Sequence, residues 1–202
     1  MGVMNLGYTA KRALDYSVAV GGLLVGAPFM AAIAVAIKVD SPGTVLFTQE
    51  RLGRGGKPFQ LMKFRTMRSA PLRFNADGST MIEHGDGRIT RVGRWLRGGL
   101  DELPQLVNIL RGEMSLIGPR PDLVQQRALY EAEEEHKLDV LPGITSLPVV
   151  LGRNEIPWKK RVEIDVAYID RWSLALDLKI FVETIAMAVG RHVFDFEELE
   201  IA

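Results

Sequence analysis

Two adjacent carboxylates, Asp101 and Glu102, stand between Leu100 and Leu103. Leucine on both sides predicts that the acids lie at the edge of a packed surface, where burial and neighbouring charges shift carboxyl pKa values. Such a pair can hold Mg²⁺, which takes oxygen ligands and leaves room for substrate phosphates. An aspartate can also attack phosphorus as a nucleophile. The alternative is a helix cap, since acids are favoured at the positive end of a helix dipole.

Basic residues flank this pair on both sides. Four arginines precede it: Arg88, Arg91, Arg94 and Arg97. Arg120 follows it, between two prolines in the loop 118–121. Guanidinium groups bind phosphate oxygens in a two-pronged way that lysine cannot reproduce. The combination indicates phosphoryl chemistry, with Asp101 and Glu102 as candidate ligands of Mg²⁺.

A second group of basic residues lies upstream, in a segment that alternates apolar with polar residues. Phe59–Met67 has this strand pattern, which points Lys63 and Arg65 to one face together. That face is either a phosphate site or a solvated or lipid-facing strand edge. Gly152–Asn154 reads as a tight polar loop that could present Arg153.

Composition excludes several other functions. The 202 residues hold 25 Lys+Arg and 25 Asp+Glu, so no bulk charge recruits nucleic acid. Cysteine is absent, which removes disulfides and thiolate metal sites. The three histidines, His84, His136 and His192, share no ligand spacing, so a zinc site or a Ser-His-Asp triad has little to build on. No Walker or Rossmann glycine motif is present, which disfavours an ATPase or a dehydrogenase.

The N-terminal region carries a long apolar run. Tyr16–Ile37 has no charged residue and approaches the roughly 20 residues that a membrane span needs. Pro28 near its middle removes a backbone hydrogen bond and predicts a kink. Basic residues on both flanks favour a re-entrant hairpin, because positive charge prefers the cytoplasmic side. A single span and a buried core helix are the alternatives.

The remaining pattern predicts an α+β protein that is mostly helical. Val39–Phe47 is expected to be a Ser-Pro-Gly turn that leads into a short strand, and this strand and Phe59–Met67 are expected to form a small antiparallel hairpin around the glycine-rich loop 49–58. Helices are expected at 89–100, 103–110, 123–138, 158–172 and 174–193. Several of them are expected to be amphipathic and interfacial, and 123–138 to be a charged surface helix with a solvated face. Ser173 is a candidate cap for the last helix, and Ser69–Gly87 reads as a loop near the site. We expect two parts, a membrane hairpin over 1–38 and a catalytic domain over 39–202.

The chain resembles the bacterial sugar transferases, the monotopic phosphoglycosyl transferases, in their short form. The resemblance rests on these motifs: Lys11-Arg12 with Asp15, Pro28, Asp40–Gly43, Phe47–Gln49 with Arg51 and Gly53, Lys63–Met67, Leu100–Leu106, Gly118–Pro121, Pro142–Thr145, Gly152–Asn154 and Leu176–Ile180. They run nearly from end to end of the chain.

The resemblance implies a reaction and a location. A phospho-sugar would pass from a UDP-sugar to a polyprenol phosphate such as undecaprenyl phosphate, giving UMP through a covalent intermediate on Asp101, with Mg²⁺ offsetting the diphosphate charge. Glu102 would be a metal ligand, a base toward the acceptor or an orienter of Asp101. The enzyme would sit on the cytoplasmic face of the bacterial inner membrane. The candidate phosphate-binding residues are Lys63, Arg65, Arg97, Pro119, Arg120, Pro121, Arg153 and Asn154.

The sequence departs from the family pattern at Ala27, which replaces a serine before Pro28, and at two places in the motifs of the candidate site. Gly98-Gly99 stand where a serine or an arginine is usual before Leu-Asp-Glu, and Val149 and Leu151 replace two amide side chains. The second change points to an unusual donor, and both changes leave a membrane-anchored scaffold without turnover as the competing function. Apolar faces such as that of 174–193 could serve a homodimer or lipid equally well.

Overall fold

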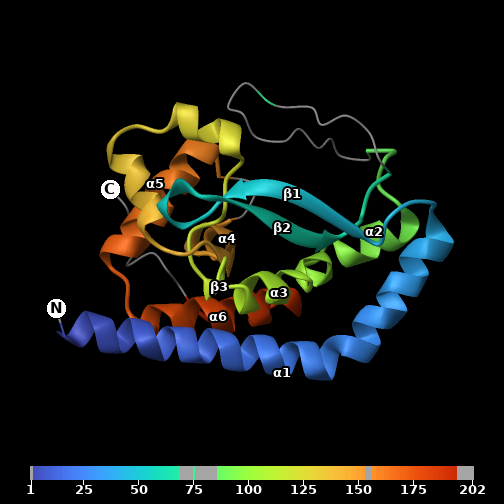
Figure 1. Ribbon diagram of the computed structural model, residues 1–202, viewed down its shortest axis with the longest axis horizontal. Helices are drawn as coiled ribbons and strands as arrows, with labels where there is room; N and C mark the ends of the chain where they lie inside the picture. Colours follow the sequence, from blue (N-terminus) through green and yellow to red (C-terminus); the bar gives the residue numbers. More distant parts are fainter. Residues whose placement is uncertain (1, 69–74, 76–85, 153–155, 195–202) are drawn as a thin grey trace.

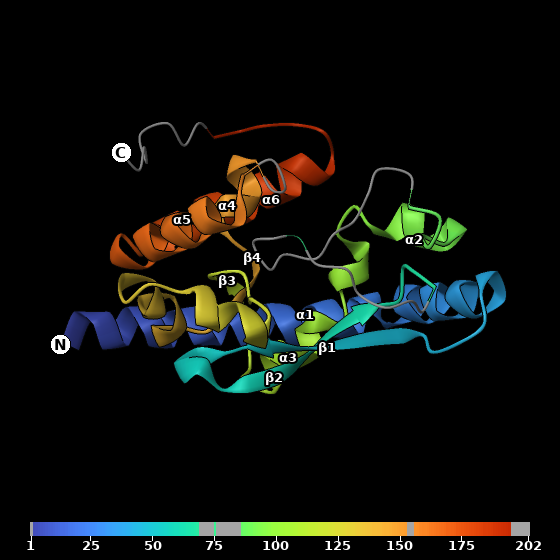
Figure 2. The ribbon, with the colours of Figure 1, turned by 90° about the horizontal axis from the view of Figure 1, so that it is seen from above.

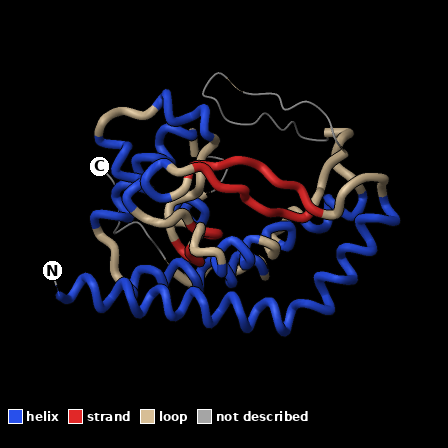
Figure 3. Tube along the Cα trace, viewed as in Figure 1, coloured by secondary structure: helices blue, strands red, loops and turns tan. Residues whose placement is uncertain are grey.

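The computed structural model describes residues 2–68, 75, 86–152 and 156–194. The fold is α+β and mostly helical, with one prominent two-stranded antiparallel hairpin, as the sequence predicts (Figure 3). Most of the predicted loop Ser69–Gly87, together with Arg153 and Asn154, lies outside the described residues.

The N-terminal helix α1 (Gly2–Asp40) runs along the whole length of the molecule (Figures 1 and 2). Pro28 lies inside it, and the helix bends in its second half (Figure 1). The expected helix-break-helix is therefore one continuous helix with a bend, for which the hydrogen bond lost at proline gives the physical reason.

The outer side of α1 is apolar and uncovered. Leu24 and Val25 are 74% and 84% exposed. Only 11% of the most apolar 18-residue stretch of α1 is buried inside the protein. By length and composition, the helix could cross a membrane. The alternative of a buried core helix is therefore wrong. The predicted division at residue 38 is not tested by the fold and stays a prediction.

The basic residues at the start of α1 turn inward. Lys11 is buried and donates to Asp177 at 2.6 Å and to the carbonyl of Ile117 at 2.8 Å. Arg12 pairs with Asp15 at 2.8 Å. These side chains bind α1 to the rest of the protein. They are therefore not the solvent-facing basic flank from which the sequence argued for membrane re-entry.

The hairpin consists of β1 (Leu46–Leu52) and β2 (Pro58–Phe64), joined by the short turn η1 (Arg54–Gly56). Strand β1 is longer than expected, because Gln49–Leu52 pairs with β2 and does not belong to the loop. The side chain of Asn108 is fully buried beneath β2. It accepts from the amide of Met62 at 3.1 Å and donates to the carbonyl of Gln60 at 2.8 Å.

A chain of short elements follows the hairpin. They are α2 (Arg91–Leu96), η2 (Leu100–Glu102), α3 (Gln105–Leu110) and β3 (Ser115–Ile117). The predicted helices 89–100 and 103–110 are both shorter than expected, because the turn η2 separates them. Trp95 is 60% exposed and meets Phe29 of α1 edge to face, so it is not a core residue.

Strand β3 pairs in parallel with β4 (Gly143–Thr145). A Cβ atom at Gly143 would lie 2.2 Å from the amide nitrogen of Gly118, so this contact requires glycine.

The predicted surface helix 123–138 is wrong. The segment forms two 3-10 helices, η3 (Val124–Leu129) and η4 (Glu133–Asp139), with Tyr130 in extended conformation between them. Glu134 and Lys137 are buried, so the segment is not a solvated face either. Its helical charge pattern is overridden by tertiary ion pairs that hold these side chains inward.

The C-terminal part holds α4 (Leu147–Leu151), α5 (Trp158–Asp170) and α6 (Leu174–Ala188). Ser173 caps α6 by accepting from the amide of Leu176, as expected. Leu178 and Val189 are 62% and 70% exposed, which keeps open both lipid and a second copy as partners of this face.

Candidate active site

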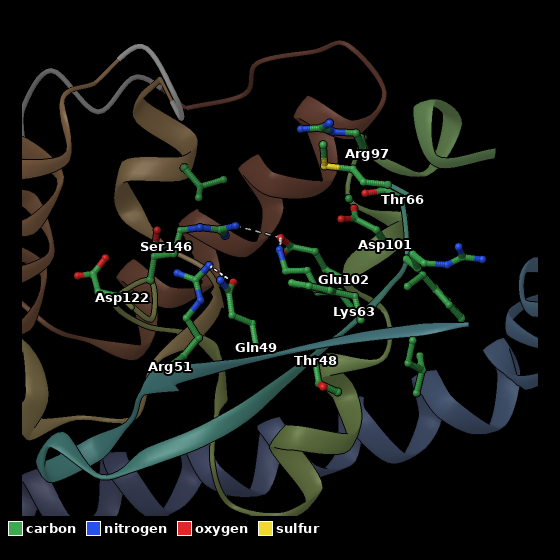
Figure 4. Close-up of a pocket in the computed structure, with 18 of the residues that line it drawn as sticks. Thr48, Gln49, Arg51, Lys63, Thr66, Arg97, Asp101, Glu102, Asp122 and Ser146 are labelled. Carbon is green, nitrogen blue, oxygen red and sulfur yellow. Dashed lines mark hydrogen bonds and ion pairs between the residues drawn. The ribbon is translucent and has the colours of Figure 1, made fainter. Parts of the chain in front are cut away.

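A cavity of about 670 Å³ opens beside the hairpin, a size typical of ligand sites. Nine basic and four acidic side chains line it, which predicts an anionic ligand. The basic residues are Arg51, Lys63, Arg65, Arg68, Arg88, Arg97, Arg120, Lys137 and Arg161, and the acidic ones are Asp101, Glu102, Asp122 and Asp165. Figure 4 shows Asp101, Glu102 and Lys63 on one side of the pocket and Asp122 and Ser146 on the other, with Arg51 between them.

The acidic pair lies on the turn η2, at the start of α3. Gly99, which precedes it, has φ +120°, a conformation that favours glycine. The departure at this position therefore fits the local backbone. Pro104 occupies the N-cap position of α3, so neither acid serves as its side-chain cap. Both acids line the pocket instead.

Glu102 is held by two cations. Its Oε1 accepts from Lys63 Nζ at 2.6 Å and from an Arg120 guanidinium nitrogen at 3.1 Å. Burial raises the pKa of Glu102, but the charges of Arg120 and Lys63 outweigh burial and lower it to about 2. Glu102 is therefore ionised at neutral pH and is a weak base.

Asp101 stands beside this group without a comparable partner. Within the described part of the chain, its side chain makes no ion pair. Burial raises its pKa, and the Lys63 charge only partly offsets that effect. Asp101 is thus a partly exposed carboxylate whose charge is poorly compensated, which leaves it available to a metal ion or to an electrophile.

The loop 118–121 delivers one side chain to the pocket. Pro119 is buried and its carbonyl accepts from the amide of Gly143 at 2.9 Å. The carbonyl of Pro121 accepts from Arg51 at 3.1 Å. The two prolines therefore fix the loop, and Arg120 alone reaches the cavity lining.

The candidate cations Lys63, Arg65 and Arg97 differ in their hydrogen-bond partners. Lys63 reaches Glu102, whereas Arg65 donates to the carbonyls of Ser41 and Pro42 at 2.8 and 2.6 Å. Both residues line the pocket, but these hydrogen bonds of Arg65 go to backbone carbonyls of the turn after α1. Arg97 lines the pocket with a buried Nη1 that has no hydrogen-bond partner among the described residues.

A second ion cluster closes the opposite side of the pocket. Lys137 pairs with Asp122, and its Nζ lies 3.0 Å from Asp165 in an ion pair that falls short of hydrogen-bond geometry. Asp122 also accepts from Tyr130 at 2.7 Å and from Trp158 Nε1 at 3.0 Å. Burial raises the pKa of Asp165 to about 6, with Lys137 opposing, whereas Lys137 outweighs burial and lowers the pKa of Asp122.

Four of the seven arginines that line the pocket are not among the candidate phosphate-binding residues: Arg51, Arg68, Arg88 and Arg161. Arg51 lies in the segment 49–58 that the sequence predicts to be a loop, so strand alternation does not single it out. Burial and the nearby Arg120 lower its pKa to about 10. Arg161 lies in α5, where its spacing to Asp165 is that of an ordinary surface ion pair. No sequence signal distinguishes it, because its exposure to the pocket depends on tertiary packing.

One of the two replaced amide positions, together with the nearby Ser146, lies in the cavity wall. Val149 lines the cavity, whereas Leu151 is 38% exposed and is not part of the lining. Ser146 also lines the cavity and is buried. Any effect on the donor is therefore expected from 146 and 149.

The chemistry of the donor set bears on Mg²⁺. Among the described residues no group of three or more histidine, cysteine, aspartate or glutamate side chains could hold a metal. One or two carboxylates nevertheless suffice where substrate phosphates complete the coordination. Asp101, which pairs with no cation among the described residues, and Glu102, whose two ion pairs both involve Oε1, fit a Mg²⁺ whose coordination is completed by phosphate oxygens.

The chain was compared with known proteins. Residues 6–191 match the model of the family described as "Bacterial sugar transferase". A UDP-glucose:undecaprenyl-phosphate glucose-1-phosphate transferase of Xanthomonas campestris is 43% identical over 199 residues, which is 93% of this chain and 40% of that protein. An undecaprenyl-phosphate glucose phosphotransferase of Komagataeibacter xylinus is 44% identical over 196 residues, 91% of this chain and 36% of that protein.

A third relative is closer in length. The UDP-glucose:undecaprenyl-phosphate glucose-1-phosphate transferase of Caulobacter vibrioides is 42% identical over 185 residues, 87% of this chain and 68% of that protein. The chain thus spans well under half the length of the first two relatives and about two thirds of the third. Since the family model covers nearly all of it, the chain belongs to the bacterial sugar transferase family.

Proposed function

We propose that this protein transfers a phospho-sugar from a UDP-sugar to undecaprenyl phosphate, giving polyprenyl-diphospho-sugar and UMP. The names of the relatives support both substrates, and they make UDP-glucose the first donor to test. The observation that carries the proposal is Asp101, a poorly compensated carboxylate in a basic cavity, next to a glutamate already held by two cations.

The proposed reaction has two steps. Asp101 attacks the sugar-bearing phosphorus, the bond from that phosphorus to the bridging oxygen breaks, and the electron pair leaves on UMP. A phosphate oxygen of undecaprenyl phosphate then attacks the same phosphorus, and the Asp101 carboxylate is released. Bound Mg²⁺ would offset the diphosphate charge, with Asp101 and Glu102 as its protein ligands.

The roles of the neighbouring residues follow from their contacts. Lys63 and Arg120 are fixed by Glu102 and would present their remaining donors to the reacting phosphate. The low pKa of Glu102 disfavours the general-base alternative. Orientation of these two cations and metal ligation are therefore the roles we propose for it.

We further propose that α1 enters the cytoplasmic leaflet of the inner membrane and returns, as a monotopic anchor. Its uncovered apolar side and the bend in its second half support this topology. The chain has no native cysteine, so Val3→Cys and Val45→Cys can be labelled singly. Both should react with a reagent confined to the cytoplasm; reaction at only one position would indicate a span.

The activity test is UMP release across a panel of UDP-sugars, with and without Mg²⁺ and undecaprenyl phosphate. We expect release from at least one donor, and dependence on Mg²⁺. No UMP from any donor would instead favour a membrane-anchored scaffold that has kept the fold.

A further inference from the structure

Arg161 on α5 is an unusual cation. It is only partly exposed, it lines the cavity, and its Nε is buried without a hydrogen-bond partner. Within the described residues its side chain makes no hydrogen bond and no ion pair. Burying a charge without a partner costs free energy, so such a site favours an incoming anion.

The acids nearest to Arg161 on its own helix are already engaged. Asp165, one turn further along, is the default partner for an i,i+4 pair, but its carboxylate lies against Lys137 at 3.0 Å. Glu163 pairs with Lys160 at 2.9 Å. Lys137 thus takes the carboxylate that would otherwise neutralise Arg161, and the guanidinium is left for a ligand.

The other cations near the middle of the cavity are also committed. Lys63 and Arg120 bind Glu102, and Arg51 donates to Gln49 and to the carbonyl of Pro121. Arg97, whose Nη1 has no partner among the described residues, lies near Asp101 (Figure 4), and Arg161 adds another uncommitted guanidinium elsewhere in the cavity lining, on α5. Helix α5 lies at the opposite end of the hairpin from α2, the helix that leads to Asp101 (Figures 1 and 2).

We propose that Arg161 binds the phosphate that leaves with the nucleoside, so that this end of the cavity is the nucleoside monophosphate subsite. This inference rests on the proposed function. When the bond between the sugar-bearing phosphorus and the bridging oxygen breaks, negative charge collects on the departing phosphate. A guanidinium is suited to hold it through two parallel hydrogen bonds.

The position of α5 favours the nucleotide over the acceptor. The acceptor carries a lipid chain and approaches from the apolar helix α1, which runs along the lower edge of the molecule in Figure 1, whereas α5 lies at the upper left. A water-soluble nucleotide has no such constraint. The acceptor phosphate is therefore expected nearer to Asp101 than to Arg161.

The experiment measures binding of UMP alone, by calorimetry on the detergent-solubilised full chain, so that it needs no turnover. Arg161→Gln should weaken UMP binding roughly tenfold or more, because it removes a charge-assisted hydrogen bond. Arg161→Lys, which keeps the charge but loses the fork, should fall between that variant and the native protein. Lys160→Gln is the matched control, since Lys160 is the neighbouring cation on α5, pairs with Glu163 and is not part of the cavity lining, and this variant should bind UMP as the native protein does.

Steady-state kinetics then separate the substrates. Arg161→Gln should raise the KM for the UDP-sugar and leave that for undecaprenyl phosphate unchanged. Unaltered UMP affinity in a variant that melts like the native protein would overturn the inference, as would a change confined to the acceptor KM or a native protein that does not bind UMP. UMP binding that depends on Arg161 without UMP release from any donor would sink the proposed function alone. If Arg161→Gln does not fold, Arg161→Lys carries the same test.

Discussion

Two pairs of carboxylates line the same cavity and share one electrostatic pattern. The pairs are Asp101 with Glu102 and Asp122 with Asp165. In each pair one acid, Glu102 or Asp122, forms ion pairs with cations that lower its pKa. In each, burial raises the pKa of the second acid, Asp101 or Asp165. The pairs differ in access: Asp165 is 1% exposed, whereas Asp101 is partly exposed.

The difference in exposure indicates that the Asp122 pair stabilises the fold, whereas the Asp101 pair can meet a ligand. Asp122 is held by Lys137, Tyr130 and Trp158, whereas neither oxygen of Asp165 has a hydrogen-bond partner among the described residues. Burial against Lys137, not complete hydrogen bonding, therefore closes this pair. The Asp101 pair leaves one carboxylate uncompensated at the surface of the cavity. Perturbed pKa values alone would have marked both pairs as catalytic candidates.

The largest effect is expected from Asp101→Asn. A neutral amide is a poor nucleophile and a poor metal ligand, so UMP release should fall by about a thousandfold or more. Intact-mass measurement should show no phospho-sugar adduct on the variant. The melting temperature should hold, because burial disfavours the Asp101 carboxylate in the native fold. Substantial UMP release from this variant would contradict the nucleophile assignment.

The next largest effect is expected on stability, from replacing the lysine that pairs with each acid pair: Lys137 for Asp122 and Lys63 for Glu102. Lys137→Met leaves two buried carboxylates facing each other and should cost about 3–5 kcal/mol of unfolding free energy. Lys63→Met should cost less, because Glu102 keeps Arg120 and lies closer to solvent. Denaturant unfolding in detergent measures both variants. Equal losses would mean that the two clusters do not differ in the way their burial indicates.

Sequence reasoning located the open pair and missed the closed one, for a physical reason. Asp101 and Glu102 are adjacent in the chain, so the sequence alone shows the two acids and the leucines beside them. Asp122, Lys137 and Asp165 come from a loop, a 3-10 helix and α5, and only tertiary packing brings them together. The same ion pairs turned the predicted helix 123–138 into two short 3-10 segments.

The hairpin and the two C-terminal helices were predictable because their periodicity is local. Apolar alternation in β2 and the helical spacing in α6 reflect one buried face each. The role of Lys11 was not predictable in this way. Its partner Asp177 lies near the other end of the chain, and the pair converts an apparent membrane-flanking charge into a tie between α1 and α6.

The smallest effect is the pH dependence of stability that Asp165 contributes. Its pKa is about 6 in the folded protein, against an ordinary value of 3.8, so the folded state binds this proton more tightly than the unfolded state. Its contribution is therefore most favourable below about pH 4 and is lost as the pH rises to 6, by at most about 3 kcal/mol. Melting of the native protein and of Asp165→Asn between pH 4 and 7 should show the native protein losing stability relative to the variant over this interval. The same comparison with Asp101→Asn should give a weaker trend, because solvent screens a partly exposed carboxylate. A stronger trend for Asp101 would reverse the assignment of the open and closed pairs.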